Sequence, residues 1–244
     1  MTTNNIPSML TPVSEICGDK IEINLKVKVI HLWIIPDRIN PTENESLHTL
    51  LLDEKCGKIH ATIQKNLIPH FKEIFLEGST YVFEKILVAL NDVSFTTTNH
   101  KDKLNFMGST NLFKVNAPEI HIHHFEFMSF LNILSSTKED KLLDIIGHVD
   151  KKNSIKEIEK NGKKVMDIHL KIWSTMGVCN SFFETKMLLN VDIPAINDYK
   201  LRLTGENANL TQGVSQMTGS TIIPLADDLL QTKKNTIEDL IEST

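Results

Sequence analysis

The sequence predicts a mainly β fold, with a closed five-stranded barrel and one helix, then a second, incomplete barrel-like unit and a flexible C-terminal tail. Three observations predict it. Short apolar runs with a period of two recur between residues 20 and 115, which is typical of half-buried strands. One stretch with a helical period separates the third run from the fourth. Residues 204–244 are polar, with a weakly helical end, and predict a flexible segment.

The first strand is expected over residues 20–35, where apolar side chains alternate with charged or polar ones. Pro36 ends it, because proline cannot donate a hydrogen bond to a sheet ladder. A polar loop then runs to Ser46. Residues 47–52 and 58–63 form two apolar runs around a short turn that contains a glycine. This arrangement predicts a hairpin of the second and third strands.

A helix is expected next, because one apolar stripe is spaced for an amphipathic helix and contains Leu67, Ile68, Phe71, Ile74 and Phe75. Pro69 is tolerated there because it lies in the first helical turn.

Two more strands follow the helix, over residues 80–90 and 104–115, with a polar loop over residues 91–103 between them. Five short strands with one helix between the third and the fourth are the layout of an OB-fold barrel. Such a barrel binds its ligand across strands two and three, between the loop that joins strands one and two and the loop that joins strands four and five.

A second unit begins after Pro118. We expect a short helical connector over residues 121–134, strands over 141–149, 165–173 and 180–191, and a charged turn over 151–164. Three strands are too few to close a barrel. The predicted domains are therefore a flexible segment over 1–18, a complete barrel over 19–117, a partial second unit over 118–198 and a polar tail over 199–244.

Composition narrows the functional classes. No apolar run approaches 18 residues, so we expect no membrane span, and the first twenty residues lack the pattern of a secretory signal. The three cysteines are far apart, which argues against a disulfide framework. The net charge is −5, so any nucleic-acid site must be a local basic surface. Only Arg38 and Arg202 are arginine among 26 basic residues, which favours binding without strong sequence choice.

No catalytic constellation is present in the sequence. The GxSxG, HExxH, P-loop and GxGxxG motifs are all missing, so we expect no enzyme and no cofactor. His121, His123 and His124 are close together, but no cysteine lies near them. We therefore expect no metal site.

Six separated segments resemble the large DNA-binding subunit of replication protein A, most closely in its plant type. In the order in which the family has them, they are LLLDEKCGKIHATI, EGSTYVFEKILVAL, NFMGSTNLF, KLLDIIGHV, EKNGKKVMDIHLKIW and ETKMLLNVDIPAI. The resemblance covers residues 20–200. It implies tandem OB domains that hold single-stranded DNA in replication, recombination and repair, in the nucleus, together with other subunits or with replication and repair proteins.

The second unit departs from the family. There the strand that MDIHLKIW matches is followed by a hairpin partner with a stacking tryptophan, a helix and a further strand, and this middle part is missing here. The family's subunit also has a protein-interaction barrel before this region and a zinc-containing barrel after it. The segment TKKNTIEDLIEST resembles the linker to the latter.

A binding site for single-stranded nucleic acid needs flat rings on which bases stack and cations that attract the phosphates. Phe95, in the loop of residues 91–103, matches a family stacking aromatic, with a buried anchor of the loop as the alternative. Gln64 stands at the other stacking position, where an amide in place of a ring predicts weaker stacking. Trp33 closes the first strand beside a flanking loop, where packing at the barrel end is the alternative. His60 matches a position that is usually arginine, and is expected to be either a weak, pH-dependent cation or an exposed histidine without a role.

Candidate contacts to the phosphate backbone group around the two loops, and they are Arg38, Lys58, Lys65, Lys85, Lys101 and Lys103. The predicted function is single-stranded DNA binding. Two alternatives stay open. The chain is an OB-fold interaction module, because OB barrels also bind proteins, or it is an incomplete paralogue that binds little DNA and does not fold stably beyond residue 118.

Overall fold

The computed structural model describes residues 7, 9–18, 22–92, 96–135, 141–160, 163–172, 176–179 and 184–203. The chain divides into two compact units. One comprises Met1–Ile145 and Val149–Thr185, and the other comprises Ile146–His148 and Lys186–Thr244. Within the described ranges, none of the helices has the length and apolar character needed to cross a membrane.

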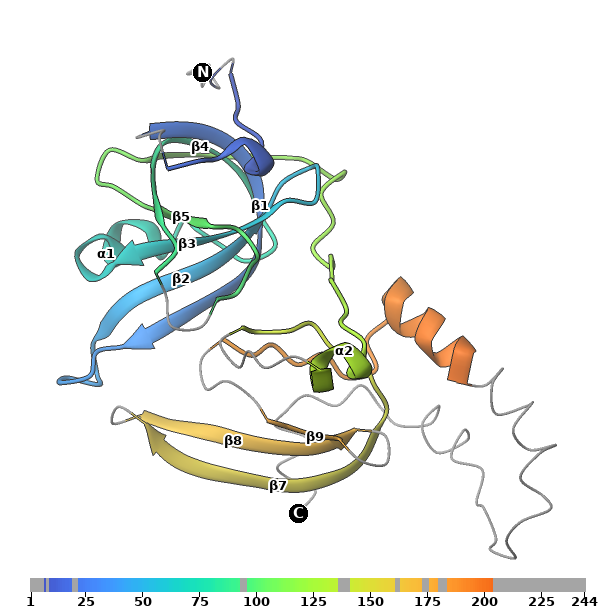
Figure 1. Ribbon diagram of the computed structural model, residues 1–244. Helices are drawn as coiled ribbons and strands as arrows, with labels where there is room; N and C mark the ends of the chain where they lie inside the picture. The colour runs from blue at the N-terminus through green and yellow to red at the C-terminus, as the bar shows by residue number, and fades with distance from the viewer. Residues whose placement is uncertain are drawn as a thin grey trace, which may run out of the picture. The chain divides into compact units, whose positions relative to one another are not determined.

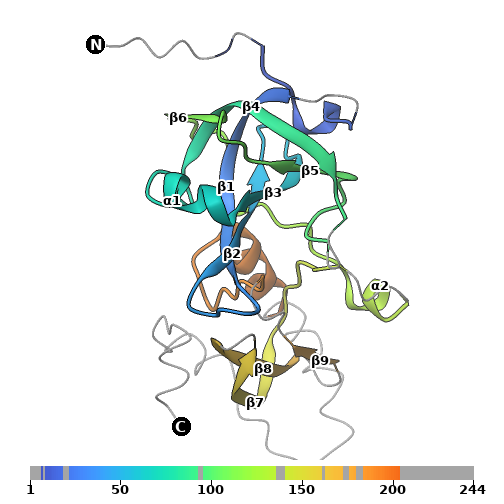
Figure 2. The same ribbon diagram turned by 90° about the vertical axis from the view of Figure 1, so that its left-hand side faces the viewer.

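The first unit contains a closed barrel of OB topology (Figures 1 and 2). Its elements are β1 (Glu22–Pro36), β2 (Asn44–Leu52), β3 (Lys58–Gln64), α1 (Ile68–Phe71), β4 (Thr80–Leu90), β5 (Asp102–Asn105) and β6 (Asn111–Val115). The strand order is β1-β2-β3-β5-β4-β6, and β1 also pairs with β4, which closes the ring. Among these six strands, the β3–β5 pair is parallel and the other pairs are antiparallel. The expected five-stranded barrel is confirmed, with β6 as an additional strand on β4.

A bulge in β1 decides which of its side chains face outward. Val27 and Val29 are fully buried in the barrel core. The pairing register of β1 with β2 shifts between Val29 and His31, and beyond this point Leu32 and Ile34 pack against the core. A bulge adds one residue to a strand and reverses its alternation. His31 and Trp33 therefore lie on the outside of the barrel.

The helix is shorter than the apolar stripe predicts. α1 covers four residues, follows a 3-10 turn over Lys65–Leu67, and has Pro69 in its first turn as expected. Phe71 and Phe75 are fully buried, and the Phe71 ring lies 5.0 Å from that of Phe106. Ile74 is 49% exposed, so its expected place in the buried stripe is wrong.

The single strand expected over residues 104–115 is two strands, β5 and β6, separated by a turn. Met107 and Thr110 close the turn, because the Met107 N–H donates to Thr110 Oγ1 over 2.9 Å and the Thr110 N–H donates to the Met107 carbonyl over 3.1 Å. Along β4, residues 80–84 pair with β6 and residues 87–90 pair with β5. Lys85 lies between these pairings with a φ of 60°.

The region after the barrel differs most from expectation. The helix α2 covers only Phe130–Ser135 of the connector (Figure 1). Residues 141–148 form isolated bridges and no strand, so the strand expected over 141–149 is wrong. The charged residues 151–160, expected as a turn, belong to β7 (Val149–Lys160). β7 pairs with β8 (Lys163–Ile172), which pairs with β9 (Met176–Cys179). The third strand therefore precedes its expected place, and residues 184–191 contain none.

The three strands β7, β8 and β9 form an open antiparallel sheet in the described part of the chain, so no second barrel closes there. In the other unit, residues 194–203 are helical, and the His148 N–H donates to Tyr199 Oη over 3.1 Å. The tail expected over residues 199–244 lies almost entirely outside the described residues. The predicted domain boundaries stay predictions.

Candidate nucleic-acid interface

The outward side chains of β1, β2, β3 and β5 form one surface, here called the outer face. The apolar side chains between them fill the core, as Leu47, Ile59 and Leu104 do, so alternation directs their neighbours outward. The members of the outer face are His31, Trp33, Ser46, His48, Lys58, His60, Thr62, Gln64, Lys103 and Asn105. This is the side of the barrel on which OB domains bind oligonucleotides.

Four rings pack against one another on the outer face. The Trp33 ring centroid lies 5.0 Å from that of His31, 5.8 Å from that of His48 and 5.5 Å from that of His60. Trp33 retains 7% of its exposure but is not part of the core cluster. Trp33 is thus buried against three histidine rings, and both interpretations of it, a stacking ring and packing at the barrel end, stay predictions.

A hydrogen-bond chain joins three of the outward side chains. Ser46 Oγ lies 2.7 Å from His48 Nε2, and His48 Nδ1 lies 2.9 Å from His60 Nε2. Burial lowers the pKa of His48 to about 4, and burial, then the charges of His48 and Lys103, lower the pKa of His60 to about 3. Both rings are therefore neutral at pH 7. The expectation that His60 is an exposed or cationic side chain is wrong, because it is 2% exposed.

Two other parts of the chain border the outer face. Leu50 and Leu52 of β2 pack against Ala117 and Ile120, which follow β6. Near the ring cluster, His31 Nε2 lies 2.8 Å from the Glu184 carbonyl oxygen. The aromatic side chains thus occupy the middle of the face, between an apolar cluster and the loop of residues 37–43.

The loop between β1 and β2 is held by its own polar groups. Asp37 Oδ1 accepts hydrogen bonds from the N–H groups of Ile39 and Asn40 over 2.8 and 3.1 Å. Lys65 Nζ bridges Asp37 and Glu43 over 2.9 and 2.6 Å, which raises the pKa of Lys65 and lowers that of Asp37 to about 2. Lys65 is thus half-exposed but already engaged with two carboxylates.

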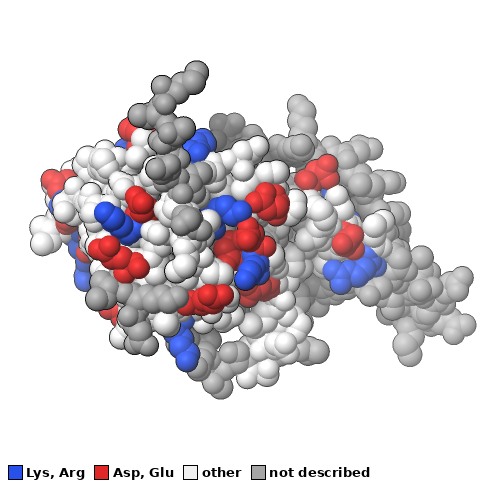
Figure 3. Space-filling view, turned by 90° about the horizontal axis from the view of Figure 1, so that it is seen from above, with Lys and Arg blue, Asp and Glu red and all other residues white. Residues whose placement is uncertain are grey.

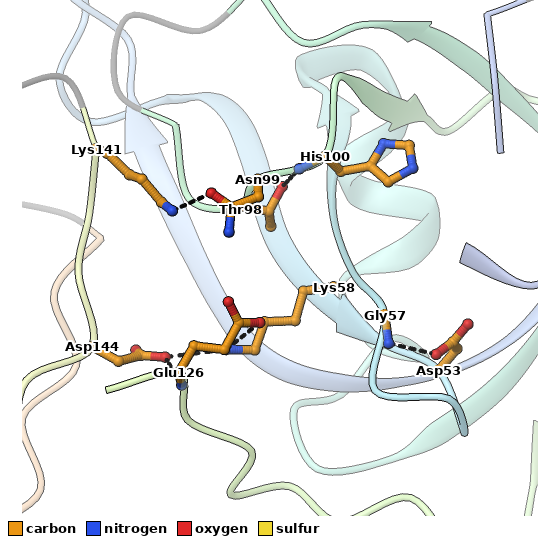
Figure 4. Close-up of polar contacts among 9 residues, drawn as sticks. All are labelled: Asp53, Gly57, Lys58, Thr98, Asn99, His100, Glu126, Lys141 and Asp144. Carbon is orange, nitrogen blue, oxygen red and sulfur yellow. Dashed lines mark hydrogen bonds and ion pairs between the residues drawn. The ribbon is translucent and has the colours of Figure 1, made fainter. Parts of the chain in front are cut away.

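Lys58 is engaged by two residues that follow the barrel, Glu126 of the connector and Asp144 beyond it (Figure 4). Its Nζ lies 3.1 Å from Asp144 Oδ2 and 3.6 Å from Glu126 Oε1, and its side chain is only 9% exposed. Asp144 Oδ2 also accepts a hydrogen bond from the Glu126 N–H over 2.9 Å. Residues 126 and 144 therefore place two carboxylates on a lysine that was predicted to contact phosphate.

Residues 141 and 142 contact the loop between β4 and β5. The Leu142 N–H donates to the Thr96 carbonyl over 3.0 Å, and Lys141 Nζ donates to Asn99 Oδ1 (Figure 4). Phe95, the predicted stacking aromatic of this loop, lies outside the described residues. Nearby, Lys103 Nζ lies 2.5 Å from Asp92 Oδ1 with its side chain 16% exposed.

The remaining predicted residues are exposed. Gln64 ends β3 opposite Ser46, and Arg38 lies in the loop of residues 37–43. Lys85 lies in the middle of β4, and Lys101 directly precedes β5. Arg38 makes no ion pair with any described residue. On the face of the molecule seen in Figure 3, basic and acidic side chains are interspersed without a continuous basic patch.

Among the predicted residues, the structure therefore places Trp33, Lys58, His60, Gln64 and Lys103 on the outer face. His31 and His48 were missed, although His31 stands two residues before Trp33 and His48 lies in the expected second strand, where it pairs with Trp33 of β1. In the described part of the chain, no group of three His, Cys, Asp or Glu side chains is placed to hold a metal ion.

A family model named "Domain of unknown function DUF223" matches residues 14–136, half of the chain. The chain belongs to the DUF223 family. The DUF223 match takes in every strand of the barrel and continues through the connector to α2. Among curated proteins, none matches this DUF223 chain.

Several solved structures are similar to it. One is a replication protein A heterotrimer bound to ssDNA, with 19% identity and a TM-score of 0.47, over 70% of this chain and 40% of that one. Another is DNA-binding domain A of S.cerevisiae replication protein A, with 21% identity and a TM-score of 0.36, over 44% of this chain and 95% of that one. A third is fission yeast Pot1 with ssDNA, with 11% identity and a TM-score of 0.35, over 46% of this chain and 41% of that one. The DUF223 chain thus spans well under half of the replication protein A chain that it matches.

Proposed function

We propose that the outer face of the barrel binds single-stranded DNA and performs no catalysis. The observation that carries the proposal is the ring cluster of His31, Trp33, His48 and His60 in the middle of this face. A barrel of this topology binds oligonucleotides here, and aromatic groups are the surfaces on which unpaired bases stack, at about 1–3 kcal/mol per base. The resemblance of six sequence segments to replication protein A supports the same assignment.

The phosphate backbone is expected to run along the lysines that border the rings. Lys58 and Lys103 share the outer face with the rings, and both are held by carboxylates in the free protein. A phosphate group is a charge-assisted acceptor like a carboxylate, so it replaces Asp144 and Asp92 on these lysines. Arg38, exposed in the neighbouring loop, adds a cation that needs no such exchange.

Fluorescence anisotropy with a labelled 30-mer oligothymidine tests the proposal on the full chain. We expect saturable binding at low salt that weakens as salt rises, with a slope of at most about 0.7 per phosphate neutralised. Absence of saturable binding at low salt would remove the function. A pull-down that captures a replication protein without any oligonucleotide binding would instead select the interaction module.

Phe95 is proposed as the stacking aromatic of the β4–β5 loop, on the strength of its match to the family position. Phe95→Ala should weaken oligothymidine binding several-fold, in line with the loss of one stacked base. Ile74→Ala is the matched control, because Ile74 is an exposed apolar side chain in the segment after α1. Equal affinities of both variants and the wild type would withdraw the role of Phe95.

The finer role follows the resemblance. We infer a nuclear protein of DNA replication, recombination and repair that works with other replication protein A subunits or repair proteins. Only one barrel closes in the described part of the chain. Its affinity should therefore fall below that of a tandem protein by the roughly 10²–10⁴-fold gain that a linked second site supplies.

A further inference from the structure

Four outward side chains form a continuous row across four neighbouring strands. Trp33 of β1 pairs with His48 of β2, His48 pairs with Thr62 of β3, and Thr62 pairs with Asn105 of β5. Three strand spacings of about 4.8 Å give the row a length of roughly 14 Å. His60 stands two residues before Thr62 and therefore shares its face.

Hydrogen-bonding atoms along this row are buried without a partner among the described residues. They are Trp33 Nε1, Thr62 Oγ1, Asn105 Oδ1 and, beside them, His60 Nδ1. Trp33, His60 and Thr62 each retain 7% or less of their exposure. Native proteins leave few buried polar atoms unpaired, because each one costs stability. Such atoms gathered on one surface, outside the core, indicate a ligand that completes them.

The unpaired atoms include both kinds of hydrogen-bonding group. The indole N–H of Trp33 only donates, the amide oxygen of Asn105 only accepts, and the Thr62 hydroxyl does either. His60 Nδ1 is adaptable. When His60 Nε2–H donates to His48 Nδ1, His60 Nδ1 accepts, and when His48 Nδ1–H donates to His60 Nε2, His60 Nδ1 donates. Ser46 Oγ fits both arrangements, because a hydroxyl can accept from or donate to His48 Nε2.

We propose that this polar row hydrogen-bonds to the base edges of a bound single strand, so that binding is selective for base identity. The inference rests on the proposed function and deepens it. Stacking and lysine–phosphate contacts tolerate any sequence, whereas the fixed donor of Trp33 and the fixed acceptor of Asn105 favour the bases that satisfy both. The shortage of arginine, which predicts weak sequence choice, does not bear on this row, because none of its donors is an arginine.

Two lysines lie beside the row on the same face. Lys58 precedes His60 by two residues in β3, and Lys103 precedes Asn105 by two residues in β5. Phosphates bound by these two lysines would therefore place the bases of the same strand next to the row.

The test compares the affinities of the full chain for labelled 12-mers of dT, dC and dA, a mixed-sequence library of the same length, and an abasic 12-mer, at one salt concentration. We expect the affinities for the most tightly and the most weakly bound base-bearing oligomers to differ about tenfold or more. The abasic strand should bind more weakly than any of them, since it offers only phosphates.

Thr62→Val is the decisive variant, because it keeps the volume and removes the unpaired hydroxyl. We expect it to reduce the preference between bases by about threefold or more and to leave the melting temperature unchanged or higher. Thr49→Val is the matched control on the neighbouring strand, since the Thr49 hydroxyl is buried but donates to the His31 carbonyl over 2.9 Å. It should lower the melting temperature by about 2–4 °C without altering the preference.

Each possible result supports or overturns the inference. Equal affinities for all base-bearing oligomers would overturn the inference and leave the proposed function standing. No binding to any oligomer would overturn both. A fall in melting temperature for Thr62→Val as large as that for Thr49→Val would show that the Thr62 hydroxyl is paired inside the protein, and this would overturn the inference without any reference to DNA.

Discussion

Acid should unfold this barrel earlier than its carboxylates alone would, because two neutral histidines are buried on the outer face. The pKa values of His48 and His60 in the folded protein are about 4 and 3, against an ordinary value near 6.5 in the unfolded chain. A group whose pKa is depressed by folding stabilises the protein fully above its unfolded pKa. That stability is lost as the pH falls from about 6.5 toward the folded values.

The magnitude at pH 5.5 depends only on the unfolded pKa, since both folded values lie well below 5.5. Each histidine then lowers the free energy of unfolding by about 1.4 kcal/mol relative to pH 7.5, so the pair lowers it by about 3 kcal/mol. This is a large part of the 5–15 kcal/mol that holds a typical domain together. The Ser46–His48–His60 hydrogen-bond chain should break at the same time.

Urea unfolding at pH 7.5 and 5.5 measures this loss. Trp33 fluorescence reports on the barrel alone in a Trp173→Phe background, since the chain has two tryptophans. In the double variant His48→Gln/His60→Gln, the free energy of unfolding should no longer differ between pH 7.5 and pH 5.5, whatever its value at either pH. His121→Gln, which removes an exposed histidine, should keep it. The reasoning would be refuted if the free energy of unfolding of the wild type differed by under 1 kcal/mol between the two pH values, or if the double variant kept the full difference.

Three further predictions concern the contacts around the barrel. Asp144→Asn removes the nearer carboxylate from Lys58 and should strengthen oligothymidine binding about threefold or more in anisotropy titrations, whereas exposed Glu73→Gln should not. Asp53→Ala removes the acceptor of three backbone N–H groups and should lower the free energy of unfolding by about 2–4 kcal/mol in urea, against under 1 kcal/mol for exposed Glu54→Ala. Limited proteolysis should leave a core that extends past residue 118 into the connector. A core that ends at residue 118 would show that the connector does not hold to the barrel.

The barrel could be predicted from the sequence because its signals are local. Alternating apolar side chains mark β1, β2, β3 and β4, and the predicted bounds of β4 are those observed. β7 was missed because its sequence, VDKKNSIKEIEK, is mostly charged. Its strand conformation comes from pairing with β8, and no pattern within a single segment reports such a partner.

The sequence identified several residues of the outer face but not how their side chains are arranged. Trp33 was predicted, but the side of the barrel on which it lies is fixed by the bulge at residues 29–31, because one inserted residue reverses every side chain beyond it in β1. The engagement of Lys58 is non-local, because Asp144 is 86 residues away along the chain. Both features depend on tertiary structure.

The way in which the lysines are held has a consequence for the salt dependence of binding. A lysine that is free in the protein releases one counterion from the strand for each phosphate it neutralises. Lys58 and Lys103 instead exchange a carboxylate for a phosphate, and the carboxylate set free takes up a cation from solution. The net release per contact is therefore smaller, and the slope of log affinity against log salt should be shallower than the number of contacts implies. Asp144→Asn removes one of these carboxylates, so the variant should bind more tightly at low salt and show a steeper slope. Tighter binding with an unchanged slope would mean that the nearer carboxylate of Lys58 is not displaced when DNA binds.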